Sequence, residues 1–156
     1  MMNSDDSAPP SSSAVRTAAL AWHGEVRRAL ARGLRAASAA RAQAPDAYDL
    51  LHASAEGIAA VVRRQIQAET RDLGPVLEQL DAWGPQRLER LKELHEREQA
   101  AATHVLDPHS DVLLLASKLE GSIREIVRTL RLEEKELLDA DLLDDSTLVQ
   151  TKQFGG

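Results

Sequence analysis

The chain has 156 residues, a length that fits a single domain with a substantial buried core. Its net charge of −6 argues against a general nucleic-acid-binding protein, which ordinarily carries a surplus of Lys and Arg. It contains no cysteine, which excludes disulfides, thiolate metal sites and cysteine nucleophiles. No apolar run reaches the roughly 20 residues that span a bilayer, so we expect neither a membrane nor a nucleic acid as partner.

Both ends of the chain are predicted to lie outside the folded domain. Residues 1–13 are rich in Ser and Pro, lack the basic and apolar regions of a signal peptide, and are predicted to be disordered. Residues 139–156 are predicted to form an acidic, loosely ordered tail, which leaves residues 14–138 as the domain. The absence of a signal peptide and of cysteine leads us to expect a cytoplasmic protein.

The composition and the spacing of apolar residues predict helices throughout the domain. Hydrophobic residues make up 43% of the chain but aromatic residues only 3%, a balance typical of packed helices. The first long helix is predicted to end at Ala44-Pro45, and the second to run from about Asp46 to Leu73, with Gly74-Pro75 interrupting it before a further turn or two. Pro85 suits the first turn of a third helix.

A break at Asp107-Pro108 separates the third helix from the fourth, and Asp107 is predicted to be the N-cap of the fourth. Short connections make neighbouring helices antiparallel. The sequence therefore predicts an all-α fold, an antiparallel up-and-down four-helix bundle. We expect Trp22 and Trp83 to fill volume beside the helix cores.

Polar residues interrupt the apolar stripe of every predicted helix. A polar side chain inside a bundle must be hydrogen-bonded, paired with a charge or bound to a metal. Because these residues share the helical spacing of their apolar neighbours, we expect them to point inward and to meet. The interruptions are His23 in the first helix, Gln65 and Glu69 in the second, His95 in the third, and Thr129 and Glu133 in the fourth. We expect solvated or capping roles for the other histidines, His52, His104 and His109.

Two segments resemble the hemerythrin-like (HHE cation-binding) family. Trp22-His23-Gly24-Glu25-Val26-Arg27 is similar to the family's first-helix histidine segment. The stretch from Glu69 through Leu73-Gly74-Pro75-Val76-Leu77 resembles its second-helix motif, in which a His precedes the Glu by four residues and Leu-Phe-Pro follows. The family continues with a ligand His in the third helix and a His and a Glu four residues apart in the fourth. The resemblance covers roughly residues 20–138 and implies a hemerythrin-like bundle.

The resemblance implies an incomplete set of metal ligands. The positions that match the family's ligands are His23, Glu69, His95 and Glu133, while Gln65 and Thr129 stand where two histidines are expected. Gly74 replaces the family's aromatic residue, and Gln99 offers no second histidine on the third helix. Two irons need more nitrogen and oxygen donors than remain, so we expect less than a full dinuclear iron centre. Glu98, one turn beyond His95, is a reserve ligand.

Three states of this cluster stay open. The two histidines and two carboxylates can hold one divalent ion, most naturally iron, zinc or manganese, with water completing the coordination sphere. They can instead satisfy one another by hydrogen bonds without a metal. A complete dinuclear site is the third state. If a metal binds, we expect iron, and one ion rather than two.

No residues are predicted to be catalytic, because the sequence has no phosphate-binding Gly-rich loop, no nucleophile motif and no zinc-protease histidine pair. An enzyme is therefore the minority expectation. The resemblance implies a non-haem metal-binding protein, or one that binds or senses a small gas such as O₂ or NO, whose metal site is mononuclear or lost. The alternative is a metal-free helical bundle that self-associates or docks an unknown protein partner through its basic first helix.

Overall fold

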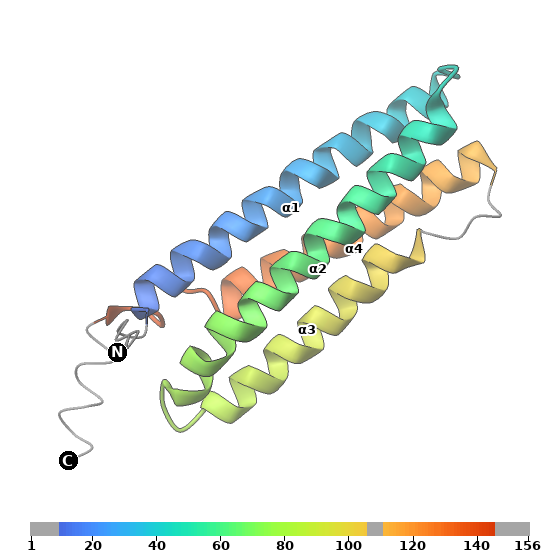
Figure 1. Ribbon diagram of the computed structural model, residues 1–156. Coiled ribbons are helices and arrows are strands. Elements are labelled where there is room, and N and C mark those ends of the chain that lie inside the picture. Colours follow the sequence, from blue (N-terminus) through green and yellow to red (C-terminus); the bar gives the residue numbers. More distant parts are fainter. Residues whose placement is uncertain (1–9, 106–110, 146–156) are drawn as a thin grey trace, which may run out of the picture.

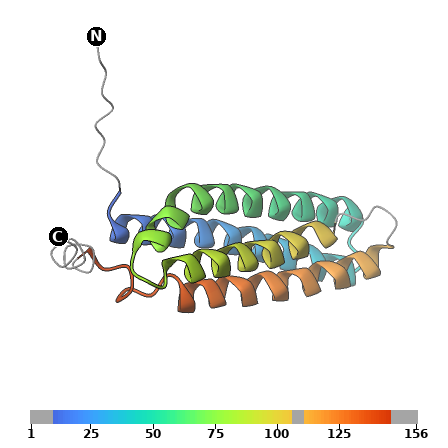
Figure 2. The same ribbon diagram turned by 90° about the horizontal axis from the view of Figure 1, so that it is seen from below.

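The computed structural model describes residues 10–105 and 111–145, and these residues form a four-helix bundle (Figure 1). Successive helices run in alternating directions, and the view from below shows the same arrangement (Figure 2). Each helix packs against two neighbours around the bundle, and α2 also contacts α4 across the diagonal. The all-α bundle is thus confirmed. The helices are α1 (Ser12–Arg41), α2 (Ala47–Gln79), α3 (Gly84–His104) and α4 (Val112–Glu136). None of the described helices is both long and apolar enough to cross a membrane.

Side-chain caps fix where α1 and α4 begin. The Oγ of Ser11 accepts a hydrogen bond from the backbone N–H of Ala14 at 3.1 Å. The Oδ1 of Asp111 accepts one from the backbone N–H of Leu114 at 2.9 Å. Such caps satisfy N–H groups that have no partner within the helix. The capping role predicted for Asp107 therefore belongs to Asp111, and Asp107 itself lies outside the described residues.

The interruption predicted in the second helix is wrong, because α2 continues through Pro75 to Gln79. A proline inside a helix removes one backbone hydrogen bond and costs about 3 kcal/mol. Leu77 and Leu80 follow Pro75 and are fully buried. Full burial of a leucine stabilises the fold by about 1.5 to 3 kcal/mol, so these two side chains offset the cost of the proline. Gly84 then begins α3, at a position where a Cβ would collide with the carbonyl oxygen of Glu78.

Buried apolar side chains form two separate clusters along the bundle. The large core lies toward the α1–α2 connection and contains, among others, Val26, Leu30, Ile58, Val62, Ala102, Leu119, Ile126 and Leu130. The small core lies toward the α2–α3 connection and contains Val15, Ala19, Leu73, Leu77, Leu80, Leu91, Leu94, Leu137, Leu138 and Leu143. On each helix the residues of the two cores are separated by a short stretch that carries buried polar side chains.

That stretch forms one polar layer between the two cores. Its members are His23, Gln65, Glu69, His95, Glu98, Thr129 and Glu133, all of them buried. Every helix contributes to it, and α2, α3 and α4 each contribute two residues. The bundle thus brings its buried charged groups to one level and surrounds them with apolar side chains.

Residues 139–145, predicted to belong to a loosely ordered tail, pack against the small core. Leu143 is buried there, and the guanidinium Nε of Arg16 donates a hydrogen bond to the carbonyl oxygen of Leu138 at 2.7 Å. Asp145 accepts hydrogen bonds from the backbone N–H and the hydroxyl of Ser13. The leucines therefore extend the folded part beyond residue 138, and residues 146–156 lie outside the described residues. Trp83 is 66% exposed, so its predicted packing role is wrong.

Candidate metal centre

Two carboxylates lie between two imidazoles in the polar layer. The Nε2 of His23 lies 2.9 Å from Glu69 Oε1 and 2.5 Å from Glu133 Oε2. The Nε2 of His95 lies 2.7 Å from Glu69 Oε2 and 3.2 Å from Glu133 Oε1. Each carboxylate therefore turns one oxygen toward each histidine. The structure brings together all four side chains that the sequence singled out, one from each helix.

Three of the four form the most compact group. Among the described residues, one ligand atom each from His23, Glu69 and Glu133 lie within 4.8 Å of one another. His95 contacts the other oxygen of each carboxylate, Glu69 Oε2 and Glu133 Oε1, and is not part of that group. A single ion would therefore find its closest set of donors beside His23.

The second ring nitrogen of His23 already has a partner. His23 Nδ1 lies 3.0 Å from Glu134 Oε2, and Arg27 holds the same carboxylate through two hydrogen bonds of 2.6 and 2.7 Å. Burial by itself would lower the pKa of His23, but the contacts with Glu133, Glu134 and Glu69 outweigh it and raise the pKa to about 12. The same contacts with Arg27 and His23 lower the pKa of Glu134 to about 2, against the effect of its partial burial.

The position of Glu134 determines what His23 Nε2 can do. With the Nδ1 proton donated to Glu134, a neutral ring presents a lone pair at Nε2, facing oxygens of two carboxylates. Such an arrangement is repulsive unless a proton or a cation lies between the atoms. A proton at Nε2 can point to only one of the two oxygens, Glu69 Oε1 at 2.9 Å or Glu133 Oε2 at 2.5 Å. A cation can contact both oxygens at once.

Glu98 is the least satisfied group in the layer. Its side chain is fully buried and neither carboxyl oxygen has a hydrogen-bond partner. Burial, followed by the negative charges of Glu133 and Glu69, raises its pKa to about 8. Even when protonated, a buried carboxyl group with no partner costs about 1 to 3 kcal/mol. Glu98 is thus the carboxyl group of the layer with no protein partner, and it is not part of the compact group around His23.

Gln65 and Thr129 are buried in the layer but contribute little to its pairing. The Nε2 of Gln65 donates to Glu69 Oε2 at 3.2 Å, and its Oε1 has no partner. Thr129 donates its hydroxyl proton to the carbonyl oxygen of Glu125, one turn back on its own helix, at 2.9 Å. The amide therefore orients Glu69, while the hydroxyl is directed away from the carboxylates.

His52 and His104 have no contact with this layer among the described residues. His52 is half-buried, and its Nε2 is hydrogen-bonded to the hydroxyl of Tyr48 at 3.0 Å. His104 is exposed at the end of α3. His109 lies outside the described residues. The roles predicted for His52 and His104, away from the cluster, are consistent with these positions.

Sequence reasoning missed the pair Arg27 and Glu134. Arg27 follows His23 by four residues and Glu134 follows Glu133 directly, so both flank predicted ligands. Histidine ligands usually donate their second N–H to a carboxylate or a carbonyl, and that rule is the signal that points to Glu134. The sequence does not show how α1 is positioned along α4, and this position brings Glu134 to His23 and Arg27.

The donor set suits a small divalent cation, and its spacing is that of ligand atoms around one ion as well as that of direct hydrogen bonds. Bonds of about 2.1 Å at right angles place neighbouring ligand atoms about 3.0 Å apart. The four nitrogen–oxygen separations between the histidines and the carboxylates range from 2.5 to 3.2 Å. Imidazole nitrogen with carboxylate oxygen suits iron, zinc and manganese, and this donor set does not choose among them.

Comparison with known proteins adds no further constraint: no family model, no curated protein and no solved structure matches the chain.

Proposed function

We propose that this chain is a metal-binding four-helix bundle that holds one divalent cation between His23, Glu69 and Glu133, with His95 and Glu98 close by. The proposal follows the resemblance to hemerythrin-like proteins, in which the same bundle levels carry the ligands. Iron is the first choice because the resemblance implies it. One ion rather than two is proposed, because Gln65 and Thr129 leave only one imidazole for each potential ion.

One observation carries the proposal, namely the surroundings of His23. Its Nδ1 contacts a carboxylate that an arginine fixes in place, and its Nε2 faces two further carboxylates. A carboxylate behind a histidine fixes the ring and makes its other nitrogen a better ligand. In a purely structural cluster, a single carboxylate on each side of the ring would suffice.

Charge balance supports the same conclusion. Without a metal, the raised pKa values of His23 and His95, about 12 and about 9, keep both rings protonated near neutral pH. Two positive rings then balance Glu69 and Glu133. A divalent cation that replaces the two protons leaves the charge of the layer unchanged, so it can bind without an additional counter-ion.

The resemblance extends the proposal to a small gas. An iron ion in this layer would supply a coordination position for O₂ or NO. The chain's own contribution is to orient His23 through Glu134 and to exclude bulk water by the two apolar cores. No residue in the layer is assigned a catalytic role.

A metal-free interaction bundle is the second candidate, and a specific observation favours it as well. Both histidines contact both carboxylates directly, so the protonated rings neutralise the layer without any ion. The bundle would then act through its surface, by self-association or by docking a protein partner. Glu98 is the group that this candidate leaves without a role.

Metal titration separates the two candidates. The full chain is stripped with chelator and titrated anaerobically with Fe²⁺, and separately with Zn²⁺ and Mn²⁺, by calorimetry. We expect close to one ion per chain, and an added stability of about 2.7 kcal/mol when the free metal is at 100 times its Kd. His23→Gln should abolish binding, whereas His52→Gln, a matched change outside the layer, should leave it intact.

Absorption spectra of the iron-loaded protein, recorded with and without NO, test the gas ligand. A chain that binds none of the three metals, or one that binds them equally well as the His23→Gln variant, contradicts the metal-binding proposal. The metal-free interaction bundle would then be the better description.

A further inference from the structure

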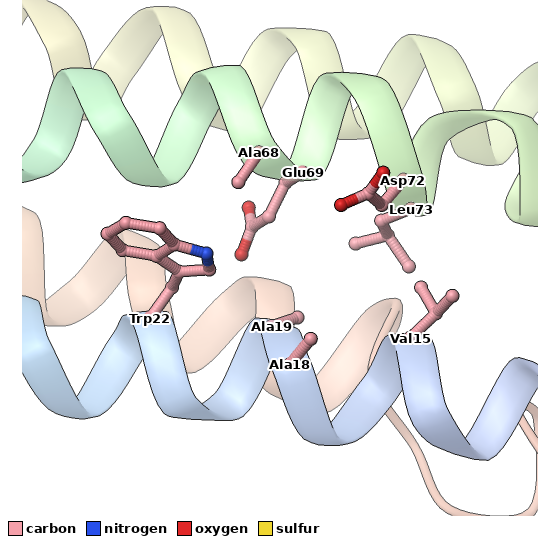
Figure 3. A pocket seen from close by; sticks show the side chains of 8 residues that line it. All are labelled: Val15, Ala18, Ala19, Trp22, Ala68, Glu69, Asp72 and Leu73. Carbon is pink, nitrogen blue, oxygen red and sulfur yellow. The ribbon is translucent and has the colours of Figure 1, made fainter. Parts of the chain in front are cut away.

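A small cavity between α1 and α2 reaches the polar layer from the side (Figure 3). Its volume is about 20 Å³, enough for a single water-sized occupant. Glu69 lines it from α2, and Figure 3 shows this carboxylate extending from α2 toward α1. Alanines leave the space open, namely Ala18 and Ala19 on α1 and Ala68 on α2. The cavity therefore ends at a carboxylate of the proposed metal centre.

A second carboxylate lines the same cavity nearer the surface. Asp72 follows Glu69 by three residues on α2, and its side chain is 40% exposed. It accepts two hydrogen bonds from its sequence neighbour Arg71, and that pairing lowers the pKa of Asp72, so the group is ionised at neutral pH. The cavity thus has one carboxylate in contact with solvent and one in contact with the buried histidines.

Trp22 separates this cavity from a wider surface groove. Trp22 and Ala18 line both the cavity and the groove, which also includes Glu25, Arg28 and Arg64. Trp22 is half-buried, and Figure 3 shows its indole on α1, directed toward α2. A change in its rotamer would widen the opening without moving a helix.

The face between α1 and α4 is less accessible to a cation. There the two-pronged ion pair of Arg27 with Glu134 covers His23 Nδ1. The side chains of Arg27 and Glu134 are 41% and 25% exposed, whereas those of Arg71 and Asp72 at the cavity mouth are 73% and 40% exposed, so water screens the Arg71–Asp72 pair more strongly. Approach between α1 and α2 instead presents carboxylate oxygens at both ends of a short path.

We propose that the cavity between α1 and α2 is the uptake path for the divalent cation, with Asp72 as the outer station, Glu69 as the inner one and Trp22 as the gate. This inference rests on the proposed metal centre. A divalent ion that sheds water needs an oxygen ligand at each step, because crossing an apolar wall without one is very costly. Carboxylates one helical turn apart supply those ligands in succession.

The test compares the rate of uptake with the equilibrium affinity. Metal-free full-length protein is mixed with Co²⁺ in a stopped-flow instrument, and the visible absorption of the bound ion is followed. Asp72→Asn should slow uptake about tenfold, as expected for the loss of local electrostatic focusing, while the Kd changes by less than about twofold. Ala68→Leu, which fills the cavity but keeps Asp72, should slow uptake as well.

Two control variants isolate the contribution of the Asp72 carboxylate. Arg71→Gln removes the ion pair but keeps the carboxylate of Asp72, and should not slow uptake. Glu56→Gln removes the same charge from an exposed site on α2, and should have no effect. Trp22→Ala, by contrast, opens the gate and should accelerate uptake.

The possible failures are distinct. If Co²⁺ binds but Asp72→Asn takes it up at the rate of the parent, the path is wrong and the metal centre stands. If Asp72→Asn and Arg71→Gln slow uptake equally, the ion pair rather than the carboxylate is responsible, and the path is again wrong. If no variant, parent included, shows bound Co²⁺ at equilibrium, the proposed function fails and the path fails with it.

Discussion

The large core and the polar layer occupy adjacent levels of the same bundle and are stabilised in different ways. The large core consists of side chains such as Leu30, Val62 and Ile126, which gain stability simply by leaving water. The polar layer contains three carboxyl groups and two imidazoles, each of which would be costly to bury alone in its charged form. Its stability therefore depends on protons or ions, and that of the core does not.

This difference shows that one helical repeat can encode both a packed apolar core and a buried polar layer. His23 and Glu133 occupy positions that continue the stripes of Val26 and Ile126, so the backbone that packs the core also points these polar side chains inward. A change in the core should alter stability at every pH and metal concentration. A change in the polar layer should alter how stability responds to pH and metal.

The largest effect is expected from a cavity in the large core. Leu119 is buried, and Leu119→Ala should lower the free energy of unfolding by about 2 to 5 kcal/mol. The loss should be the same in chelator and in saturating metal, because Leu119 belongs to the core and not to the polar layer. Urea unfolding followed by circular dichroism measures both values.

Leu113→Ala on the same helix provides the control for that experiment. Leu113 is largely exposed, so its truncation should change stability by less than about 0.5 kcal/mol. A loss in Leu119→Ala that disappears when metal is added would show that the core and the layer are not independent.

A smaller and pH-dependent effect is expected at Glu98 in the metal-free protein. Burial raises its folded pKa to about 8, above the ordinary value of 4.5. The folded state therefore holds a proton that the unfolded state has released between these pH values, and the contribution to stability falls as pH rises from 4.5 to 8. Glu98→Gln removes this titration. As pH rises from 4.5 to 8, the free energy of unfolding of the variant should therefore increase relative to that of the parent, on the order of a few kcal/mol in total.

Unfolding free energies at several pH values in chelator measure this gain, with Glu96→Gln, an exposed change on the same helix, as the control. With saturating metal, the variant should instead be less stable than the parent, because the parent then has the Glu98 carboxylate beside the cation and the variant does not. A difference between parent and variant that stays constant from pH 4.5 to 8 would mean that Glu98 does not titrate there.

The sequence allowed the level of the site to be predicted but not its outer contacts. Helical spacing relative to Val26, Leu91 and Ile126 was enough to place His23, His95 and Glu133 inside, because each helix has one face toward the core. The contact of His23 with Glu134 depends on how α1 is positioned along α4. That register comes from packing of many side chains and has no local signal.

Local signals were also misleading where tertiary packing opposed them. Gly74-Pro75 resembles a helix end, yet burial of Leu77 and Leu80 maintains α2 beyond it. The acidic composition after Leu138 suggested a loose tail, but the single buried side chain of Leu143 anchors residues 139–145. In both cases a few leucines in the small core decide the outcome, and their partners are distant in sequence.

The smallest expected effect, at least about tenfold in affinity, concerns the two positions where the resemblance leads us to expect histidines. Gln65 and Thr129 are buried in the polar layer, each four residues before a carboxylate of the same layer. Replacing both by histidine adds two imidazole donors, and we expect the affinity for iron to rise by at least about tenfold, the gain that even an outer-shell partner can give. The double replacement should also raise the number of bound ions per chain toward two, because each ion would then have two imidazoles.

Calorimetry and iron analysis of the double variant measure both quantities. The double change Gln67→His and Arg128→His adds two histidines at exposed positions of the same helices, and should raise neither. Histidine is larger than threonine, so Thr129→His has the greater risk of overpacking, and Gln65→His alone keeps the test valid if the double variant loses helicity. If folded Gln65→His binds iron no more tightly than the parent, the interior no longer holds the geometry that the resemblance implies, because the new imidazole would lie one turn from Glu69 and within reach of the same ion. The polar layer would then hold an ion only through the donors that the chain already has, and position 65 would not be a ligand position.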